Sequence, residues 1–198
     1  MARPKEFDEH QALRHAVSLF SKQGFAATST EDLMRVMGIS RQSMYDTFGD
    51  KRALFLRALE FYVTESVRRM QVELEKPGSP LSALTSALIT FAERKDMSSA
   101  NGCMGLNAIS EFGERDADVT RIARIAARSQ RNTLVRVLLK AKKLGEFDSE
   151  ADINSAADFL ECTLAGIRMA AKAGRSRRSL REIAVFAGRA LGRQKTSR

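Results

Sequence analysis

The sequence has no tryptophan, only three prolines and two cysteines among its 198 residues. Proline interrupts helices, so its scarcity leaves long stretches that can be helical. Few segments alternate polar and apolar residues as strands do, and the helix-favouring residues Ala, Leu, Arg and Glu are frequent. The composition therefore predicts an all-α protein, long enough for one large or two small domains with a real core.

Long apolar runs are also missing. No stretch approaches the length needed to cross a bilayer, and the first ten residues lack the apolar core of a signal peptide. We therefore expect a cytoplasmic protein that does not enter a membrane. In that compartment Cys103 and Cys162 are expected to be reduced thiols rather than a disulfide.

Motifs of enzymes and metal proteins are absent as well. The sequence has no nucleotide-binding loop, no nucleophile motif and no His-Glu-x-x-His pattern. His10 and His15 are five residues apart, which does not suit a shared metal on one helical face, and no Cys or carboxylate cluster completes a site. We expect no enzymatic activity, no cofactor and no metal, and interpret both histidines as surface or packing residues.

Positive charge is present but unevenly distributed. The net charge is +9, yet residues 1–52 carry 8 Lys or Arg and 7 Asp or Glu, residues 53–171 carry 16 of each, and residues 172–198 carry 9 and 1. The excess thus lies at the carboxyl end, which is either a solvated surface or an extra attraction to DNA or another acidic partner. Near the amino end, Arg3 and Lys5 form a short basic arm that either reaches a minor groove or is disordered.

Residues 29–51, STEDLMRVMGISRQSMYDTFGDK, predict two short helices joined by a tight turn. The spacing of a capping box begins at Thr28 and again at Ser29, so a helix should start here. Gly38 can end that helix in a left-handed conformation, and Ser40 can cap the next one.

On the second of these helices Met44 and Phe48 point toward the first, which leaves a polar face outward. Gln pairs bidentately with adenine, Ser donates or accepts, and Arg reaches guanine or a phosphate, so this face suits a DNA major groove. The candidates for reading bases are Arg41, Gln42 and Ser43. Those for holding the DNA backbone are Ser29, Thr30, Tyr45, Thr47 and Lys51, with Arg52 as a further phosphate contact. An ordinary helical hairpin with a solvated face is the alternative interpretation.

The run G-F-x-x-T-S-T-x-x-L from Gly24, followed by M-G-I-S-R-Q-S-M-Y-x-x-F-G-D-K-x-x-L-F, resembles the amino-terminal domain of TetR-family transcriptional repressors. The resemblance covers roughly residues 8–60. It implies a helix-turn-helix DNA-binding domain at residues 1–53, with the motif at 29–48, and a helical effector-binding and dimerisation domain at residues 54–198. It also implies a homodimer that binds a palindromic double-stranded DNA operator and responds to a small-molecule effector.

Apolar residues at helical spacing predict the remaining helices. They are expected at about residues 8–23, 50–76, 79–94, 116–144, 149–172 and 176–191, with a short one entered at Cys103. An inner face is expected to include Ile125 in the fourth of these segments, and the last segment offers the apolar residues Ile183 and Phe186. The resemblance implies that the last two helices meet those of a second subunit, where small residues such as Gly188 would permit close approach.

The tentative effector-binding residues are Phe91, Cys103, Met104, Phe112, Phe159, Arg168 and Met169. Apolar pockets between helices are lined in this way, although Met and Phe at helical spacing also build cores. Cys103 stands at a helix start, a position that favours the thiolate, so it is either an oxidant or electrophile sensor or a packing residue. Cys162 lies within an apolar segment and is expected to pack.

Together these features predict a DNA-binding transcriptional regulator, a homodimeric repressor that releases its operator when a ligand acts on the carboxyl-terminal domain. A dimeric helical adaptor without sequence-specific DNA binding is the competing prediction.

Overall fold

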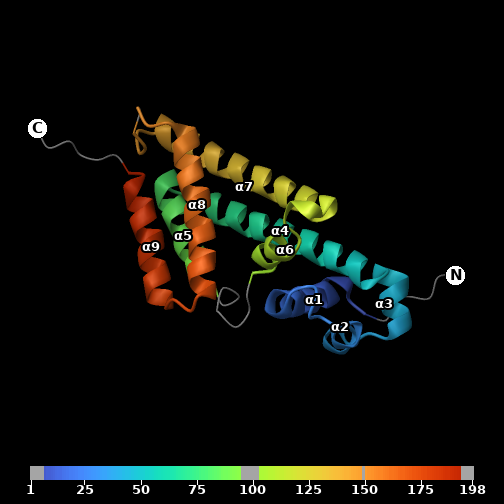
Figure 1. Cartoon of the computed structure of the whole chain (residues 1–198). Helices are drawn as coiled ribbons and strands as arrows, with labels where there is room; N and C mark the ends of the chain where they lie inside the picture. The colour runs from blue at the N-terminus through green and yellow to red at the C-terminus, as the bar shows by residue number, and fades with distance from the viewer. Residues whose placement is uncertain (1–6, 95–102, 149, 193–198) are drawn as a thin grey trace, which may run out of the picture. The chain divides into compact units, whose positions relative to one another are not determined.

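The computed structural model describes residues 7–94, 103–148 and 150–192. Within these ranges the regular elements are helices, and one isolated bridge pairs Phe147 with Gly192. The helices are α1 (Glu9–Gln23), α2 (Thr30–Met37), α3 (Arg41–Phe48), α4 (Lys51–Leu74), α5 (Pro80–Ala92), α6 (Met104–Phe112), α7 (Ala117–Lys143), α8 (Ile153–Lys172) and α9 (Arg177–Ala190), and a 3-10 turn at Gly113–Arg115 precedes α7 (Figure 1). The all-α prediction is confirmed, and each expected helix is present within a few residues of its expected bounds.

Packing divides the chain into two compact units. The first consists of Met1–Glu65 and Asn101–Ile125, and the second of Ser66–Ala100 and Ala126–Arg198. Helices α4 and α7 therefore each contribute residues to both units. The functional boundary expected between residues 53 and 54 stays a prediction.

The first unit packs α1, α2, α3 and α6 around a core that is partly aromatic. The rings of Phe20, Phe25, Phe55 and Phe112 form a cluster in which neighbouring centroids are 5.1–6.4 Å apart. Aromatic pairs at such separations are each worth about 0.5–1.5 kcal/mol beyond the area they bury. Met44 and Phe48, on the inner face of α3, are buried in the hydrophobic core of this unit, as the sequence predicts.

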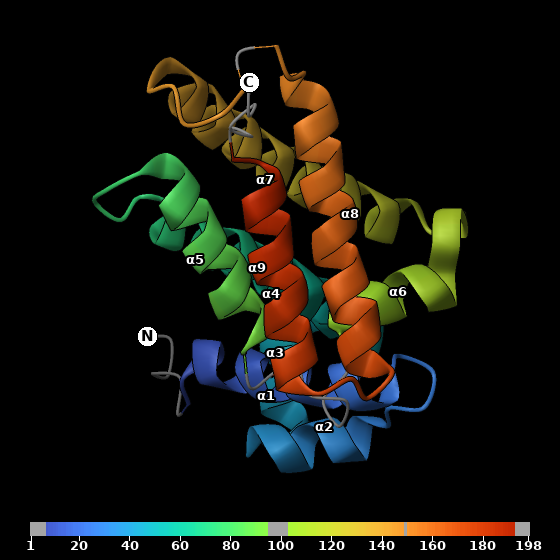
Figure 2. The ribbon, with the colours of Figure 1, turned by 90° about the vertical axis from the view of Figure 1, so that its left-hand side faces the viewer.

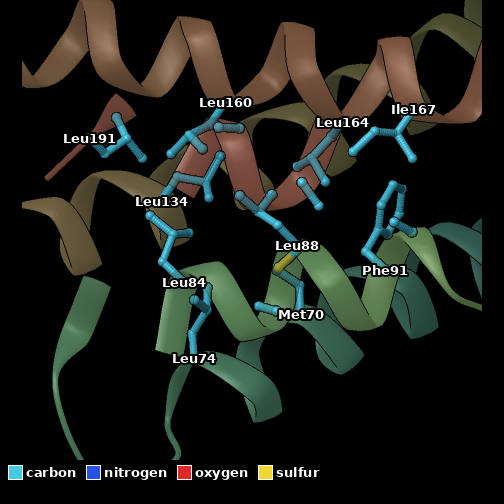
Figure 3. Close-up of a cluster of buried hydrophobic side chains, with 14 of the residues drawn as sticks. Met70, Leu74, Leu84, Leu88, Phe91, Leu134, Leu160, Leu164, Ile167 and Leu191 are labelled. Atoms are coloured by element: carbon cyan, nitrogen blue, oxygen red, sulfur yellow. The ribbon is translucent and has the colours of Figure 1, made fainter. Parts of the chain in front are cut away.

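The second unit has an aliphatic core. Figure 3 shows leucines from α5, α7 and α8 pointing toward one another, with Met70 of α4 and Phe91 of α5 beside them. Fully buried members are Leu84, Leu88, Leu134, Leu138, Leu160 and Leu164. Helices α5, α8 and α9 lie side by side in this unit (Figures 1 and 2). A fully buried leucine contributes about 1.5–3 kcal/mol through the hydrophobic effect, so these leucines hold α5, α7 and α8 together.

Gly188 lets α9 approach α5 closely. A Cβ atom placed on Gly188 would lie 2.3 Å from Oγ1 and 2.7 Å from Cγ2 of Thr85, which is far inside contact distance. The sequence suggested that Gly188 permits close approach between subunits. In the structure it permits close approach of two helices within one chain.

Several large apolar residues are exposed in the chain. Ile125, which was expected on an inner face, is 59% exposed, Phe186 is 75% exposed, and Ile183 is exposed too. Cys162, expected to pack, is also exposed, because it lies about 200° around α8 from Leu160, at about 100° per residue. Among the helices of the described residues, none is both long and apolar enough to cross a membrane.

Candidate functional site

The turn between α2 and α3 is built as the sequence predicts. Gly38 ends α2 in the left-handed region, at φ 68° and ψ 32°, and its N–H donates to the carbonyl of Met34. Ser40 then caps α3, since its hydroxyl accepts a hydrogen bond of 3.1 Å from the N–H of Ser43. Glycine adopts this left-handed conformation without the steric cost of a side chain, so the turn stays tight.

Of the two helix starts that the sequence allows, the one capped by Ser29 is present. Its hydroxyl accepts from the N–H of Asp32 at 3.0 Å and lies 2.8 Å from the Asp32 carboxylate. That hydroxyl lowers the pKa of Asp32. Thr28 is instead buried and donates its hydroxyl to the carbonyl of Gly24 at 2.6 Å. The start of α2 is therefore fixed by hydrogen bonds within a few residues.

The outward face of α3 carries Arg41, Gln42, Tyr45 and Asp46, all exposed. The Gln42 amide donates from Nε2 to both carboxylate oxygens of Asp46, at 2.8 and 2.9 Å. The Arg41 guanidinium donates to Glu31 of α2 at 2.9 Å, and both side chains remain about two-thirds exposed. These contacts hold the long side chains of the face in defined positions without burying them.

The smaller predicted residues take different places. Ser43 and Thr47 are half-buried on the flanks of α3, and the hydroxyl of Ser43 lies 2.9 Å from that of Ser40. Arg57 donates to the carbonyl of Thr47 at 2.7 Å. Thr30 is the first residue of α2 and is half-buried. Tyr45 is 45% exposed, with its ring on the open side of the helix.

Lysine and arginine at the start of α4 behave differently from each other. Lys51 lies over the ring of Phe25, with Nζ 4.3 Å from the centroid, a cation-π contact that the sequence pattern did not reveal. Arg52, expected to face phosphate, instead donates to Asp116 at 2.6 Å and to Asp118 at 3.1 Å. The hydrogen bond from Arg52 is the largest cause that lowers the pKa of Asp116 to about 2, and the same pairing raises the pKa of Arg52. Spacing did not indicate this pairing, because the acidic partners lie 64 and 66 residues away in the chain, and a phosphate contact of Arg52 stays a prediction.

Helix α6 is attached to the loop that precedes α2. The Glu111 carboxylate accepts from the N–H of Phe25 at 2.7 Å and from that of Ala26 at 3.0 Å. Asn107 of α6 donates its side-chain amide to the carbonyl of Ser21 at 2.8 Å. Sequence reasoning missed these residues because their partners are 85 or more positions away.

The tentative effector residues are divided between the two units. Cys103, Met104 and Phe112 belong to the first unit, and Met104 is fully buried in its core. Phe159 and Met169 lie on α8 of the second unit and are 41% and 54% exposed. In the second unit, Arg168 lies over the ring of Phe91, with Cζ 4.9 Å from the centroid. The assignment of these seven residues to an effector site stays a prediction.

Cys103 is buried, with a relative exposure of 5%, and its sulfur lies 3.3 Å from the hydroxyl of Tyr62. Reactive thiols are partly exposed, so this burial favours the packing interpretation over that of a sensor. His10 is exposed, 5.9 Å from the ring of Phe61, and His15 is exposed as well.

No group of three metal-ligating side chains occurs among the described residues. The basic arm at Arg3 and Lys5 and the end of the basic tail, residues 193–198, lie outside them.

Two family models match the chain over complementary stretches. Residues 12–58 match the bacterial regulatory proteins of the tetR family, and residues 78–186 match the tetracyclin repressor-like C-terminal domain. The second match alone covers more than half of the chain.

Relatives of full length agree with these matches. YezE of Bacillus subtilis strain 168, an uncharacterized HTH-type transcriptional regulator, is 32% identical over 174 residues, which cover 87% of this chain and 90% of YezE. The HTH-type transcriptional repressor ComR of Escherichia coli K12 is 28% identical over 186 residues, 92% of this chain and 88% of ComR.

A solved structure has the same fold. It is a cysteine mutant of the TetR family transcriptional regulator CifR, complexed with 26-bp double-strand operator DNA. The TM-score is 0.81 and the identity 25%, and the alignment covers 95% of this chain and 99% of CifR. With an amino-terminal helix-turn-helix and a helical carboxyl-terminal domain that both match, the chain belongs to the TetR family of transcriptional regulators, which are DNA-binding proteins rather than enzymes.

Proposed function

We propose that the protein is a homodimeric repressor that binds a palindromic DNA operator through α3 and releases it when a small molecule binds the carboxyl-terminal domain, residues 54–198. The observation that carries the proposal is the exposed polar face of α3, with Arg41, Gln42 and Tyr45 held outward over the buried Met44 and Phe48. A helix of this kind fits the major groove, where guanidinium and amide groups read base edges. The operator complex of CifR supports this assignment.

The proposed contacts divide by what they can recognise. Arg41, Gln42 and Ser43 read bases, whereas Ser29, Thr30, Tyr45, Thr47 and Lys51 hold the sugar-phosphate backbone. Contacts of the second kind fix the register of the helix on DNA and carry no sequence information. The ring of Phe25 below Lys51 limits the directions in which its ammonium group can extend. We infer that Lys51 anchors one defined phosphate rather than several.

A second copy of the chain is the proposed partner of α8 and α9. Phe159, Met169, Ile183 and Phe186 are exposed on these two helices, although large apolar side chains are usually buried. A twofold axis lets the same patch meet itself, which is how most homodimers form. Two copies of α3 then read half-sites whose centres are about 34–36 Å apart, or a multiple of one helical turn.

Release of DNA requires a ligand that favours a state in which the two reading helices no longer match the operator. Binding of ligand and of DNA then weaken each other by the same factor. Helix α4 is uninterrupted from Lys51 to Leu74 and contributes to both units, which makes it the proposed connection between ligand and reading helix.

Selection of genomic fragments, followed by a gel-shift assay, tests the proposal. Wild-type protein is expected to shift selected fragments, including its own upstream region, with an affinity that falls steeply as salt rises. Because a bidentate base contact is worth about 1–3 kcal/mol, Gln42→Ala combined with Tyr45→Ala should weaken binding at least about tenfold.

Asn132→Ala, at an exposed position on α7, is the matched control and should bind as wild type does. An adaptor without DNA recognition would select no fragment at moderate salt, and that result would overturn the repressor proposal. If the double variant still selects the same DNA fragments, α3 is not the element that recognises the sequence.

A further inference from the structure

A pocket of about 530 Å³ lies between α4 and α5 in the second unit. Its walls come from Ser66, Arg68, Arg69, Met70, Val72 and Glu73 of α4 and from Ala87, Thr90, Phe91 and Arg94 of α5 and the residues after it. Pockets of about 300–1,000 Å³ hold small organic molecules, so the volume suits a ligand of that class. Phe91, one of the tentative effector residues, lines this pocket.

The floor of the pocket is apolar. Met70 and Phe91 are buried members of the core, and Figure 3 shows both side chains within it. Ala87 adds a small buried surface, and Val72 is 49% exposed at the open side. A ligand body without polar groups would cover these surfaces and gain about 25 cal/mol per Å² removed from water.

The rim carries a positive excess. Three arginines, Arg68, Arg69 and Arg94, line the pocket together with one carboxylate, Glu73. Lys76 donates to the Glu73 carboxylate at 2.6 Å, which offsets the negative charge of that group. The residues that line the pocket therefore carry a formal positive excess, which favours a negatively charged group.

Phe91 also has guanidinium groups close to its ring. Arg94 lies 5.8 Å and Arg168 4.9 Å from the ring centroid, measured from Cζ. Nε of Arg168 is buried and has no hydrogen-bond partner among the described residues. Arg168 does not line the pocket itself, so it adds positive charge behind the Phe91 ring rather than a direct contact for a ligand.

We propose that this pocket is the effector site and that its ligand is an organic anion, with an apolar body on Met70, Ala87 and Phe91 and a carboxylate among the rim arginines. Planar guanidinium groups bind carboxylates through two parallel hydrogen bonds, which gives the charged end its orientation. The inference rests on the proposed function, since it names the class of molecule that would release the operator.

Matched pairs of probes test the inference in the full-length protein. The carboxylates 2-naphthoate and octanoate are compared with the uncharged amides 2-naphthamide and octanamide by isothermal titration calorimetry. We expect at least one carboxylate to bind at least tenfold more tightly than its amide. Arg69→Gln and Arg94→Gln should each reduce that affinity at least tenfold, whereas Arg178→Gln, whose side chain is 90% exposed on α9, should leave it unchanged.

Thermal melting of each variant checks that it is folded, and the exposed position of Arg69 makes its variant the safer of the two. Equal binding of acid and amide, or no binding of either carboxylate at about 1 mM, would overturn the inference. A gel shift with a selected DNA fragment separates the two proposals. If the protein binds DNA but no carboxylate binds or changes the gel shift, the proposed ligand class is wrong and the repressor function stands. If a carboxylate binds but no DNA does, the repressor function is wrong and the pocket remains a binding site for organic anions.

Discussion

In the first unit, α6 is attached to the loop before α2 by hydrogen bonds from Glu111 and Asn107, whereas in the second unit α5 and α9 meet without any side chain at Gly188. Hydrogen bonds have directions, so they fix one arrangement of the elements they join. Close apolar packing is less directional and fails chiefly when volume changes. The outer surfaces differ in the same sense, since α3 turns polar groups outward and α9 turns Phe186 outward.

The largest expected effect comes from making the outer surface of α9 polar. Phe186→Asp would place a carboxylate in the proposed subunit interface, and truncation of an interface hot spot costs about 2 kcal/mol or more. A twofold axis doubles that cost to about 4 kcal/mol, so the dimer should dissociate about a thousandfold more readily. Sedimentation velocity measures this change.

Leu144→Asp is the matched control for that variant, because Leu144 is an exposed apolar residue of the same unit outside α8 and α9. It should leave the dimer intact. A Phe186→Asp protein that remains fully dimeric would show that α9 does not face a second subunit.

The close approach of α5 and α9 gives the next largest effect. Gly188→Ala forces a methyl group against Thr85, and overpacking of this kind costs about 1–3 kcal/mol of unfolding free energy. Urea denaturation measures the loss. Thr85→Ala removes two of the clashing atoms, so it should restore part of the stability in the double variant, and simple additivity of the two changes would contradict the contact.

Removing the hydrogen bonds that Glu111 accepts in the first unit should have a smaller effect on the free energy of unfolding. Glu111→Ala removes the acceptor for the N–H groups of Phe25 and Ala26, at a cost of about 1–3 kcal/mol that water near this exposed carboxylate reduces. Hydrogen exchange should accelerate at these two amides. Glu182→Ala, on the exposed side of α9, is the control, and unchanged protection at Phe25 and Ala26 would disprove the attachment.

The smallest effect concerns the pairing of Arg52 with Asp116. The folded pKa of Asp116, about 2, lies below the usual value of about 3.9 for an unfolded aspartate, so the pairing stabilises the fold above pH 4. That stabilisation is lost as the pH falls from about 4 to about 2. Arg52 is 43% exposed, so solvent screens the pair.

Acid titration of unfolding free energy tests this pairing. Asp116→Asn should flatten the decline between about pH 4 and pH 2 relative to wild type. An identical slope in both proteins would mean that the carboxylate contributes nothing in that window.

Local sequence determined much of the fold in advance. The ends of α2 and α3 follow from Ser29, Gly38 and Ser40, whose hydrogen bonds close within a few residues. Such contacts depend on nearby chain alone, so spacing is sufficient to predict them. The outward residues of α3 followed from the same helical spacing.

Contacts between distant residues could not be predicted in this way. Glu111 and Asp116 act on residues 85 and 64 positions earlier, and nothing in the spacing around them indicates those partners. Helical spacing also assigned Ile125 to an inner face, although it is exposed, because a stripe of apolar residues is the same whether it meets its own core or another molecule. The sequence likewise did not separate the pocket at Phe91 from the surrounding core.

The hydrogen bond between Gln42 and Asp46 has a consequence for base preference. One N–H of the Gln42 amide is shared between the two Asp46 carboxylate oxygens, so the amide keeps its second N–H and its oxygen for DNA, whereas the carboxylate offers acceptors alone. The Asp46 end of this pair therefore matches the exocyclic amino groups of adenine and cytosine in the major groove. The keto oxygens of guanine and thymine would meet negative charge at the same place. An operator should thus favour amino bases over keto bases at the position opposite Asp46.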